Sequence, residues 1–304
     1  MRSVLPFVLT QALCTAAGVA AQQAAPENIQ AQMDKAIADY RSGDMNHARQ
    51  ELIELHAGHP QDLRVAVLLG YTDIKLQRDA EAYEALAALE KGNEGNLDLE
   101  YVLGYAMIRT GKTDEGVQRM EKVARARNSA DAWMVAGTMR FERRQFHEAQ
   151  ADAEEAIKIN VNYPGAQTLK GTSMYAVGTK QEAAPTFQAA LRNDPNDFDA
   201  NLYLGILYSQ RGDYASAQPL LELALTLRPG WPLARLELAK VYRSQGKYSE
   251  AIQLLESLTK SDPEWLEPHV ILSAVYYIEL RPEDGKRERA IVQELEEKQS
   301  VQQP

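Results

Sequence analysis

The sequence predicts an all-α fold, a solenoid built from about eight antiparallel helix pairs. Small residues recur along a helical apolar pattern at intervals of 34, 34, 33, 34, 34, 34 and 34 residues. This first small column consists of Ala36, Gly70, Gly104, Gly137, Gly171, Gly205, Ala239 and Ser273. A second small column with the same period consists of Ala48, Ala82, Gly116, Ala149, Ala183, Ala217, Ala251 and Gly285. A fixed period of this length indicates units that bury their apolar faces against one another.

The unit at residues 198–231 shows how each repeat is expected to fold. Its first apolar block has the length of one helix and ends at Gly212, and Asp213 is a favourable N-cap for a second helix. Apolar residues then recur at helical spacing until Pro229, which stops the second helix. Each repeat therefore holds two helices of about 14 residues. The small columns lie where the two helices cross, so a bulky residue at Gly205 or Ala217 would push their axes apart.

Eight such units account for most of the chain. The seven regular units are residues 29–62, 63–96, 97–129, 130–163, 164–197, 198–231 and 232–265. Residues 266–299 form a degenerate eighth unit, and its polar second helix, residues 285–299, is expected to cap the stack. Residues 300–304 are a short tail. Pro185 and Pro219 lie inside second helices and are expected to kink them.

The first 21 residues have the pattern of a secretory signal peptide. Arg2 gives a positive start, and residues 4–21 are uncharged, mostly apolar and end in small residues. An uncleaved membrane anchor is the alternative, although Pro6 and several polar residues weaken it. The sole cysteine, Cys14, follows leucine rather than the small residue that a lipoprotein signal needs. We therefore expect a periplasmic or secreted protein, with residues 22–28 as a short linker after the signal.

Charge and motif spacing argue against nucleic acid and nucleotide ligands. The net charge of -10 disfavours phosphate backbones. Residues 110–113 read TGKT, the end of a phosphate-binding loop, but Ala106 stands where the loop needs its first glycine, and a helical pattern precedes it. Glycine turns recur at this repeat position, so TGKT is interpreted as a turn between helices. Thr113 is expected to cap the second helix, and Asp114 and Glu115 after it would repel a phosphate.

The sequence carries no recognisable catalytic or metal-binding motif. It lacks a His-Glu-x-x-His pair and a Gly-x-Ser-x-Gly turn. His56 and His59 are spaced as His-x-x-His, but Gly58 and Pro60 interrupt the helix there. Surface histidines beside a turn are the favoured interpretation, rather than metal ligands. We therefore expect no enzyme activity, no cofactor and no metal.

The repeat pattern resembles the tetratricopeptide repeat family, in its exported bacterial form. In the sixth unit the resemblance is carried by Leu204, Gly205, Tyr208, Ala217, Leu221, Ala224 and Pro229. It implies a right-handed superhelical solenoid in which the first helix of each pair lines a concave groove. It also implies a scaffold that binds partner proteins, peptides or extended segments and has no catalytic residues of its own.

Groove-facing positions, placed by this resemblance, are rich in aromatic and aliphatic residues in the N-terminal units. In the first four units they comprise Tyr40, Tyr71, Ile74, Tyr101, Tyr105, Ile108, Met134 and Phe141, and the fifth unit adds Tyr175. Tyrosine offers apolar contact and a hydroxyl at low entropic cost, which suits peptide recognition. The alternative is packing between neighbouring first helices. A basic row of Arg41, Lys75 and Arg109 could hold a partner's carboxylates, or it could only complement helix C-termini.

Together these features predict a non-catalytic scaffold of the bacterial cell envelope that binds a partner protein or extended peptide, in envelope, pilus or secretion assembly. An accessory scaffold for carbohydrate binding or polysaccharide export is the alternative. It is supported by a single groove-facing neighbour pair of aromatic and carboxylate, Phe141 and Glu142. Contact with a membrane is expected only through an uncleaved signal anchor.

Overall fold

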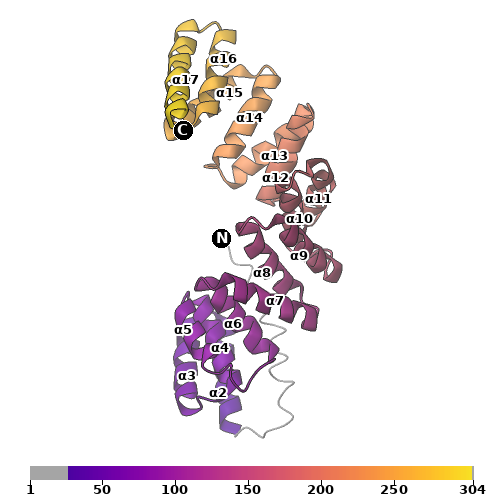
Figure 1. The fold of residues 1–304 in the computed structure, drawn as a ribbon, viewed down its shortest axis with the longest axis vertical. Coiled ribbons are helices and arrows are strands. Elements are labelled where there is room, and N and C mark those ends of the chain that lie inside the picture. Colours follow the sequence, from indigo (N-terminus) through magenta and orange to yellow (C-terminus); the bar gives the residue numbers. More distant parts are fainter. Residues whose placement is uncertain (1–26, 303–304) are drawn as a thin grey trace. The chain divides into compact units, whose positions relative to one another are not determined.

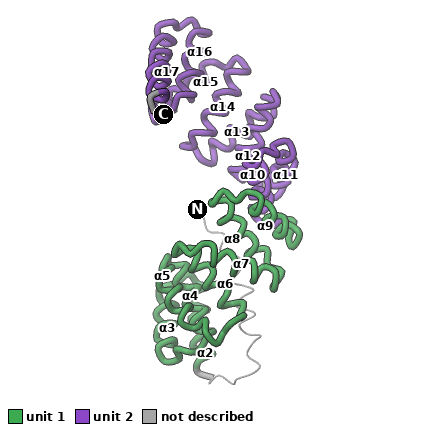
Figure 2. Tube along the Cα trace, viewed as in Figure 1, with its two compact units in different colours: residues 1–161 green, residues 162–304 purple. Residues whose placement is uncertain are grey.

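The computed structural model describes residues 27–302, which form sixteen α-helices and, within that range, no strand. The predicted signal peptide at residues 1–21 lies outside the described residues. The chain divides into two compact units, residues 1–161 and 162–304, which Figure 2 colours separately. Each unit is described by itself. Among the described helices, none is both long enough and apolar enough to cross a bilayer.

Unit 1 contains four helix pairs, α2 to α9, which are labelled in Figure 1. The first helices are α2 (Glu27–Ser42), α4 (Leu63–Lys75), α6 (Leu97–Arg109) and α8 (Ala130–Glu142). The second helices are α3 (Met45–Gly58), α5 (Asp79–Ala87), α7 (Thr113–Arg127) and α9 (Phe146–Ile159). Each second helix packs against the first helix of its own pair, and α3, α5 and α7 also pack against the first helix that follows. The first helices therefore form one layer of the unit and the second helices the other.

Unit 2 repeats this arrangement with four more pairs. Its first helices are α10 (Ala166–Ala176), α12 (Phe198–Gln210), α14 (Pro232–Ser244) and α16 (Leu266–Ile278). Its second helices are α11 (Lys180–Asn193), α13 (Tyr214–Leu227), α15 (Tyr248–Ser261) and α17 (Pro282–Gln302). Successive first helices contact one another from α10 to α16. The predicted all-α solenoid of helix pairs is confirmed.

Several predicted details of the helix ends were wrong. Thr113 does not cap the second helix: it is the first residue of α7, and the N-cap position is taken by Lys112, which makes no side-chain capping bond. Helix α2 begins at Glu27, inside the segment predicted as a linker. Helix α17 begins at Pro282 and runs for 21 residues, well beyond the expected limits of 285–299. Asp213, by contrast, caps α13 as predicted and accepts a hydrogen bond from the Ser216 amide.

The small columns mark the crossings at which paired helices approach most closely. A Cβ atom added to Gly116 would lie 2.5 Å from the Gly104 carbonyl oxygen and 2.7 Å from the Ile108 side chain. On Gly205 it would lie 2.8 Å from the Leu221 side chain. Real Cβ atoms do not come this close to other heavy atoms, so the crossings of α6 with α7 and of α12 with α13 require glycine.

A recurring hydrogen bond joins each of three repeats in unit 2 to the turn before it. The fourth residue of each first helix contacts the carbonyl oxygen of the proline six residues earlier. The pairs are Asn201 with Pro195 at 2.9 Å, Arg235 with Pro229 at 2.7 Å and His269 with Pro263 at 3.1 Å. Each proline lies one residue beyond the C-cap of a second helix, so these side chains satisfy a main-chain acceptor of the turn.

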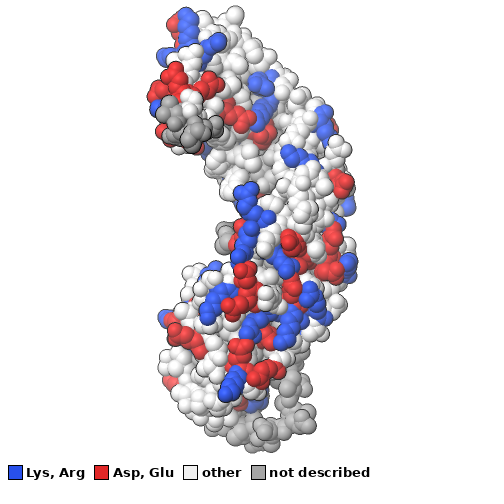
Figure 3. Space-filling view, in the orientation of Figure 1, with Lys and Arg blue, Asp and Glu red and all other residues white. Residues whose placement is uncertain are grey.

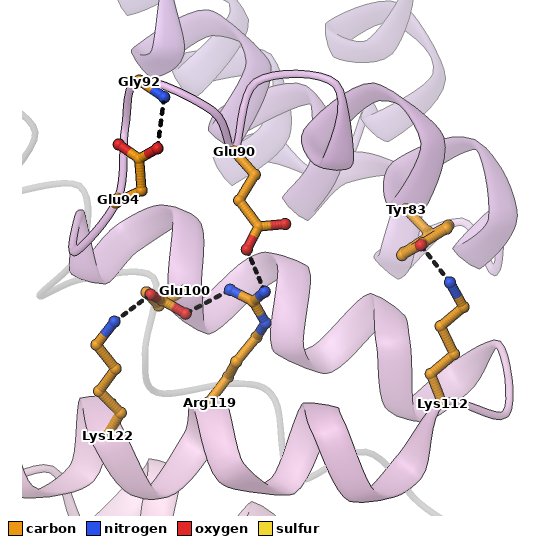
Figure 4. A network of polar contacts seen from close by, with 8 residues as sticks. All are labelled: Tyr83, Glu90, Gly92, Glu94, Glu100, Lys112, Arg119 and Lys122. Atoms are coloured by element: carbon orange, nitrogen blue, oxygen red, sulfur yellow. Dashed lines mark hydrogen bonds and ion pairs between the residues drawn. The ribbon is translucent and has the colours of Figure 1, made fainter.

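Unit 1 also contains a buried charge network, shown in Figure 4. Arg119 on α7 donates to Glu100 Oε2 on α6 at 2.6 Å, and Lys122 also contacts the Glu100 carboxylate. Arg119 bridges further to Glu90. Burial alone would raise the pKa of Glu100, but the hydrogen bonds from Lys122 and Arg119 hold it below its usual value. The network therefore favours an ionised carboxylate in the interior of the unit.

The glycine crossing can be tested with Gly116→Ala. The added methyl group would meet the Gly104 carbonyl, so we expect a loss of about 1–3 kcal/mol in unfolding free energy, measured by urea denaturation. Gly58→Ala is the matched control, because no heavy atom lies within 4 Å of a Cβ at that position. Equal stability of the two variants would contradict the crossing constraint.

The charge network predicts a pH-dependent effect of Glu100→Gln. Because the folded pKa is lowered, the carboxylate contributes stability above its unfolded value of about 4.5 and loses it as pH falls through the folded pKa. We expect the variant to be less stable by about 1–3 kcal/mol at pH 7, with the difference shrinking below pH 5. Urea titrations from pH 7 to 3 measure this, with the exposed Glu84→Gln as control. A difference that does not depend on pH would contradict the prediction.

Candidate functional site

Three consecutive first helices of unit 1 each contribute a tyrosine to one group, Tyr40 from α2, Tyr71 from α4 and Tyr101 from α6, here called the tyrosine cluster. The rings of Tyr71 and Tyr101 lie 6.1 Å apart between centroids. Tyr71 lies within electrostatic range of the Tyr40 phenol and of Asp98 on α6. The three tyrosines occupy different positions of the repeat, because they are 31 and 30 residues apart rather than 34, and the packing of α4 against α6 brings Tyr71 and Tyr101 together.

The members of the tyrosine cluster are largely buried. Tyr40 is 7% exposed, Tyr71 6% and Tyr101 5%, whereas Tyr105 is half-buried. Burial raises the pKa of Tyr40 to about 12 and also raises that of Tyr71. The Tyr40 hydroxyl is enclosed and has no hydrogen-bond partner among the described residues. A buried hydroxyl without a hydrogen-bond partner destabilises the folded state. No contact among the described residues compensates for this cost at Tyr40.

The other predicted groove residues also make packing contacts. Ile74, Ile108 and Met134 are buried in unit 1. The Phe141 ring meets Phe146 edge-on at 5.2 Å, within its own helix pair. Tyr175 belongs to unit 2, where its ring lies 4.9 Å from that of Tyr203. Packing thus accounts for much of this set, and a binding role for the same side chains stays a prediction.

The predicted basic row is not uniform in its surroundings. Arg41 is exposed in the last turn of α2. Lys75 is half-buried, and burial lowers its pKa. Arg109 donates from Nε to Asp79 Oδ2 at 3.1 Å, which ties the end of α6 to the start of α5. At least Arg109 therefore has a structural role between neighbouring pairs.

Charges of both signs are mixed around these residues. Arg127 on α7 bonds Asp98 at 2.8 Å, and Arg143 bonds Asp114 at 2.8 Å. On the face that Figure 3 shows, acidic and basic side chains alternate over unit 1. A mixed surface selects partners by shape and hydrogen bonding more than by net charge.

Comparisons with known proteins place this arrangement in a family. Two tetratricopeptide repeat profiles match, one over residues 209–270 and the other over residues 136–198 and 168–232. Residues 136–270 are tetratricopeptide repeats. Human tetratricopeptide repeat protein 13 is 29% identical over 98 residues, which are 32% of this chain and 11% of the human protein. The chain thus spans only a small part of that relative's length.

Solved tetratricopeptide repeat structures share the fold. The C-terminal part of a repeat protein from Cytophaga hutchinsonii has a TM-score of 0.58 at 15% identity, covering 76% of this chain and 95% of that one. YrrB, described as a TPR protein with an unusual peptide-binding site, has a TM-score of 0.51 at 20% identity, covering 60% of this chain and 95% of YrrB. At such low identity the likeness concerns the fold alone.

The structure brings together one group of possible metal ligands that the sequence did not predict. Asp39, His47 and Glu51 place their ligand atoms within 4.8 Å of one another, where α2 turns into α3. Asp39 accepts from His47 Nδ1 at 2.7 Å, and Lys35 is paired with Glu51. These contacts form an ion-pair network that needs no metal. His56 and His59, which the sequence singled out, are not members of this group.

A surface cleft in unit 2 gathers several polar groups that are already engaged within the protein. It encloses about 620 Å³ beside α15 and α17. His269 Nδ1 lies 2.6 Å from Glu288 Oε2, and the Tyr276 hydroxyl donates to Glu256 at 2.6 Å. The first contact joins α16 to α17 and the second joins α16 to α15, so these groups fasten the terminal helix of the repeat stack.

The unpartnered hydroxyl in the tyrosine cluster yields a prediction for Tyr40→Phe. Removing a buried hydroxyl that has no partner should leave unfolding free energy unchanged, or raise it by up to about 1 kcal/mol. Urea denaturation measures the effect. Tyr276→Phe is the control, because that hydroxyl donates to Glu256 and its loss should destabilise. A clear loss of stability in Tyr40→Phe would show that the hydroxyl has a structural role.

Proposed function

We propose that this protein is a non-catalytic scaffold that binds an extended segment of a partner protein along the first helices of unit 1. The observation that carries the proposal is the concentration of tyrosines on the first helices α2, α4 and α6. Tyr105 on α6 adds a half-buried ring close to Arg109 and Asp79. An extended peptide has main-chain donors and acceptors at regular intervals, and phenol hydroxyls can bond them whatever its sequence.

The repeat geometry suits such a ligand. First helices that stack side by side present equivalent positions at regular intervals, as Tyr71 on α4 and Tyr105 on α6, 34 residues apart, illustrate. A peptide lying across α2, α4 and α6 would meet the exposed Arg41 on α2 and the half-buried Tyr105 on α6. YrrB, a protein of the same fold, is described as having a peptide-binding site. The signal-like pattern of residues 1–21 supports a role in the bacterial envelope, including envelope, pilus or secretion assembly.

A carbohydrate-binding scaffold has weaker support. Sugar polymers dock on open aromatic rings beside hydrogen-bonding carboxylates. The pair expected to act in this way was Phe141 with Glu142, yet the Phe141 ring already packs against Phe146. The members of the tyrosine cluster likewise offer no open ring face, because they are buried.

Affinity capture from an envelope fraction tests the proposal. The immobilised full chain should retain one or more proteins, and Tyr105→Ala should reduce that retention by about tenfold or more, a hot-spot effect. Tyr83→Ala is the matched control, because Tyr83 is also half-buried in unit 1 but lies on the second helix α5. Equal retention by both variants, or retention of polysaccharide instead of protein, would count against the proposal.

Tyr105→Phe sharpens the same experiment. If the partner's main chain bonds the hydroxyl of the half-buried Tyr105, this variant should bind the captured partner less tightly by about 5- to 20-fold. Because the phenyl ring keeps its packing, weaker binding would report the lost hydrogen bond directly. Isothermal titration with the captured partner measures the change.

A further inference from the structure

Exposed apolar side chains are concentrated on and just after α16, the fourth of the first helices in unit 2. Among the described residues, four of the six exposed large hydrophobic residues fall between positions 270 and 280. They are Val270 at 45% exposure, Tyr277 at 39%, Ile278 at 50% and Leu280 at 87%. With the exposed Ala274 they form the α16 strip, which follows one side of α16 into the turn after it. Apolar patches of this kind mark interaction surfaces.

The α16 strip continues an interface that already exists inside unit 2. The residues equivalent to Val270 in the two preceding first helices are Leu236 and Leu202, each only 1% exposed. Both lie on helices that contact the next first helix, since α12 contacts α14 and α14 contacts α16. None of the described helices follows α16 as a first helix. The strip therefore presents to solvent the kind of surface that a further helix covers in the earlier repeats.

Two members of the strip depart from the rest of the repeat. The residues equivalent to Ile278 in the seven earlier units are polar or small: Arg41, Lys75, Arg109, Glu142, Ala176, Gln210 and Ser244. Leu280 has φ +55°, and its equivalents are mostly glycines with positive φ, such as Gly212 and Gly246. A bulky apolar residue is unfavourable in this left-handed conformation and at high exposure. The helix pair does not need either side chain, so both indicate an occupant outside the unit.

The strip is self-complementary about its centre. Val270 precedes Ala274 by four residues and Ile278 follows it by four, so all three lie along one side of α16. Two copies packed antiparallel about Ala274 would place each Val270 against the other copy's Ile278. The small alanine at the crossing would let the helix axes approach closely. This reciprocity is the condition for an isologous twofold interface.

Charge and polarity favour packing of α16 against α16 of a second copy, rather than packing of α16 against α2 of the next molecule in a chain. The exposed face of α2, at the other end of the described repeats, carries Gln30, Asp34 and Lys35 and would not match an apolar strip. Glu267, half-exposed at the start of α16, is paired with Lys240 at 2.7 Å. In the antiparallel arrangement the two Glu267 residues would lie about 20 Å apart, beyond the screening length in physiological salt.

We propose that the α16 strip is a dimerisation surface, on which a second copy of this chain packs its own strip about a twofold axis at Ala274. This interface uses residues of unit 2 and none of the residues proposed to bind a peptide in unit 1. The dimer would present two peptide-binding units to one partner or to two, which raises apparent affinity without new contacts.

Analytical ultracentrifugation of the full chain tests the proposal. We expect a monomer–dimer equilibrium with a dissociation constant of about 1–100 μM, as for a small interface. Ile278→Glu and Ala274→Arg should each leave monomers at about 100 μM, with unchanged helical circular dichroism. Val161→Glu is the matched control, since Val161 is 61% exposed but lies outside the strip, and this variant should still dimerise. A monomeric parent chain, or dimers that survive both strip variants, would overturn the proposal.

Cysteine cross-linking tests the symmetry axis itself. The only native cysteine is Cys14, so a Cys14→Ser background isolates an introduced thiol. Ala274→Cys should form a disulfide between copies under mild oxidation, because residues on the axis come within the Cα separation of about 4–7 Å that a disulfide needs. Glu267→Cys should not, because its two copies would lie far apart. A disulfide at position 267, or none at position 274, would contradict the proposed pairing. The absence of a disulfide at position 274 is also the result expected if the strip binds a different protein.

Discussion

The close crossing of the two helices within each pair is the constraint on which the rest of the structure depends. At Gly116 there is no room for even one methyl group beside the Gly104 carbonyl. Because a pair in such close contact buries only one side of each helix, its remaining apolar faces must be covered by the next pair. Close crossing and stacking together produce both the period of the sequence and the two layers of each unit.

Stacking also explains why polar side chains so often join neighbouring repeats. Arg109 reaches Asp79 and Arg143 reaches Asp114, each linking a first helix or its end to the second helix of the preceding pair. In unit 2, Arg211 donates to the Gln181 carbonyl at 3.4 Å, the main-chain acceptor that loses its helical partner because Pro185 has no amide hydrogen. Polar residues at repeat-equivalent positions therefore belong mainly to the architecture.

Departures from the repeat are more informative about function than the repeat itself. The exposed Ile278 and Leu280, at the end of α16, differ from their repeat equivalents and serve no purpose in holding a helix pair together. In unit 1 the half-buried Tyr105 and the exposed Arg41 lie on the layer of first helices. The two sets suggest two separate interaction surfaces, one for an extended ligand and one for a second copy of the chain.

The sequence by itself determined the helix pairs, their order and their turns, because these depend on local spacing. The sequence alone shows the small residues every 34 positions, the N-cap Asp213 and the helix-ending Pro229. It also showed that TGKT is a turn, although it misassigned Thr113, since Lys112 and Thr113 are one residue apart and spacing cannot distinguish them. Only the tertiary structure decided which groove-facing residues are buried, that Arg109 is held by Asp79, and that the α16 strip is uncovered. These features depend on how neighbouring helices pack. That packing is set by side-chain contacts between repeats, which the periodic pattern within one repeat does not reveal.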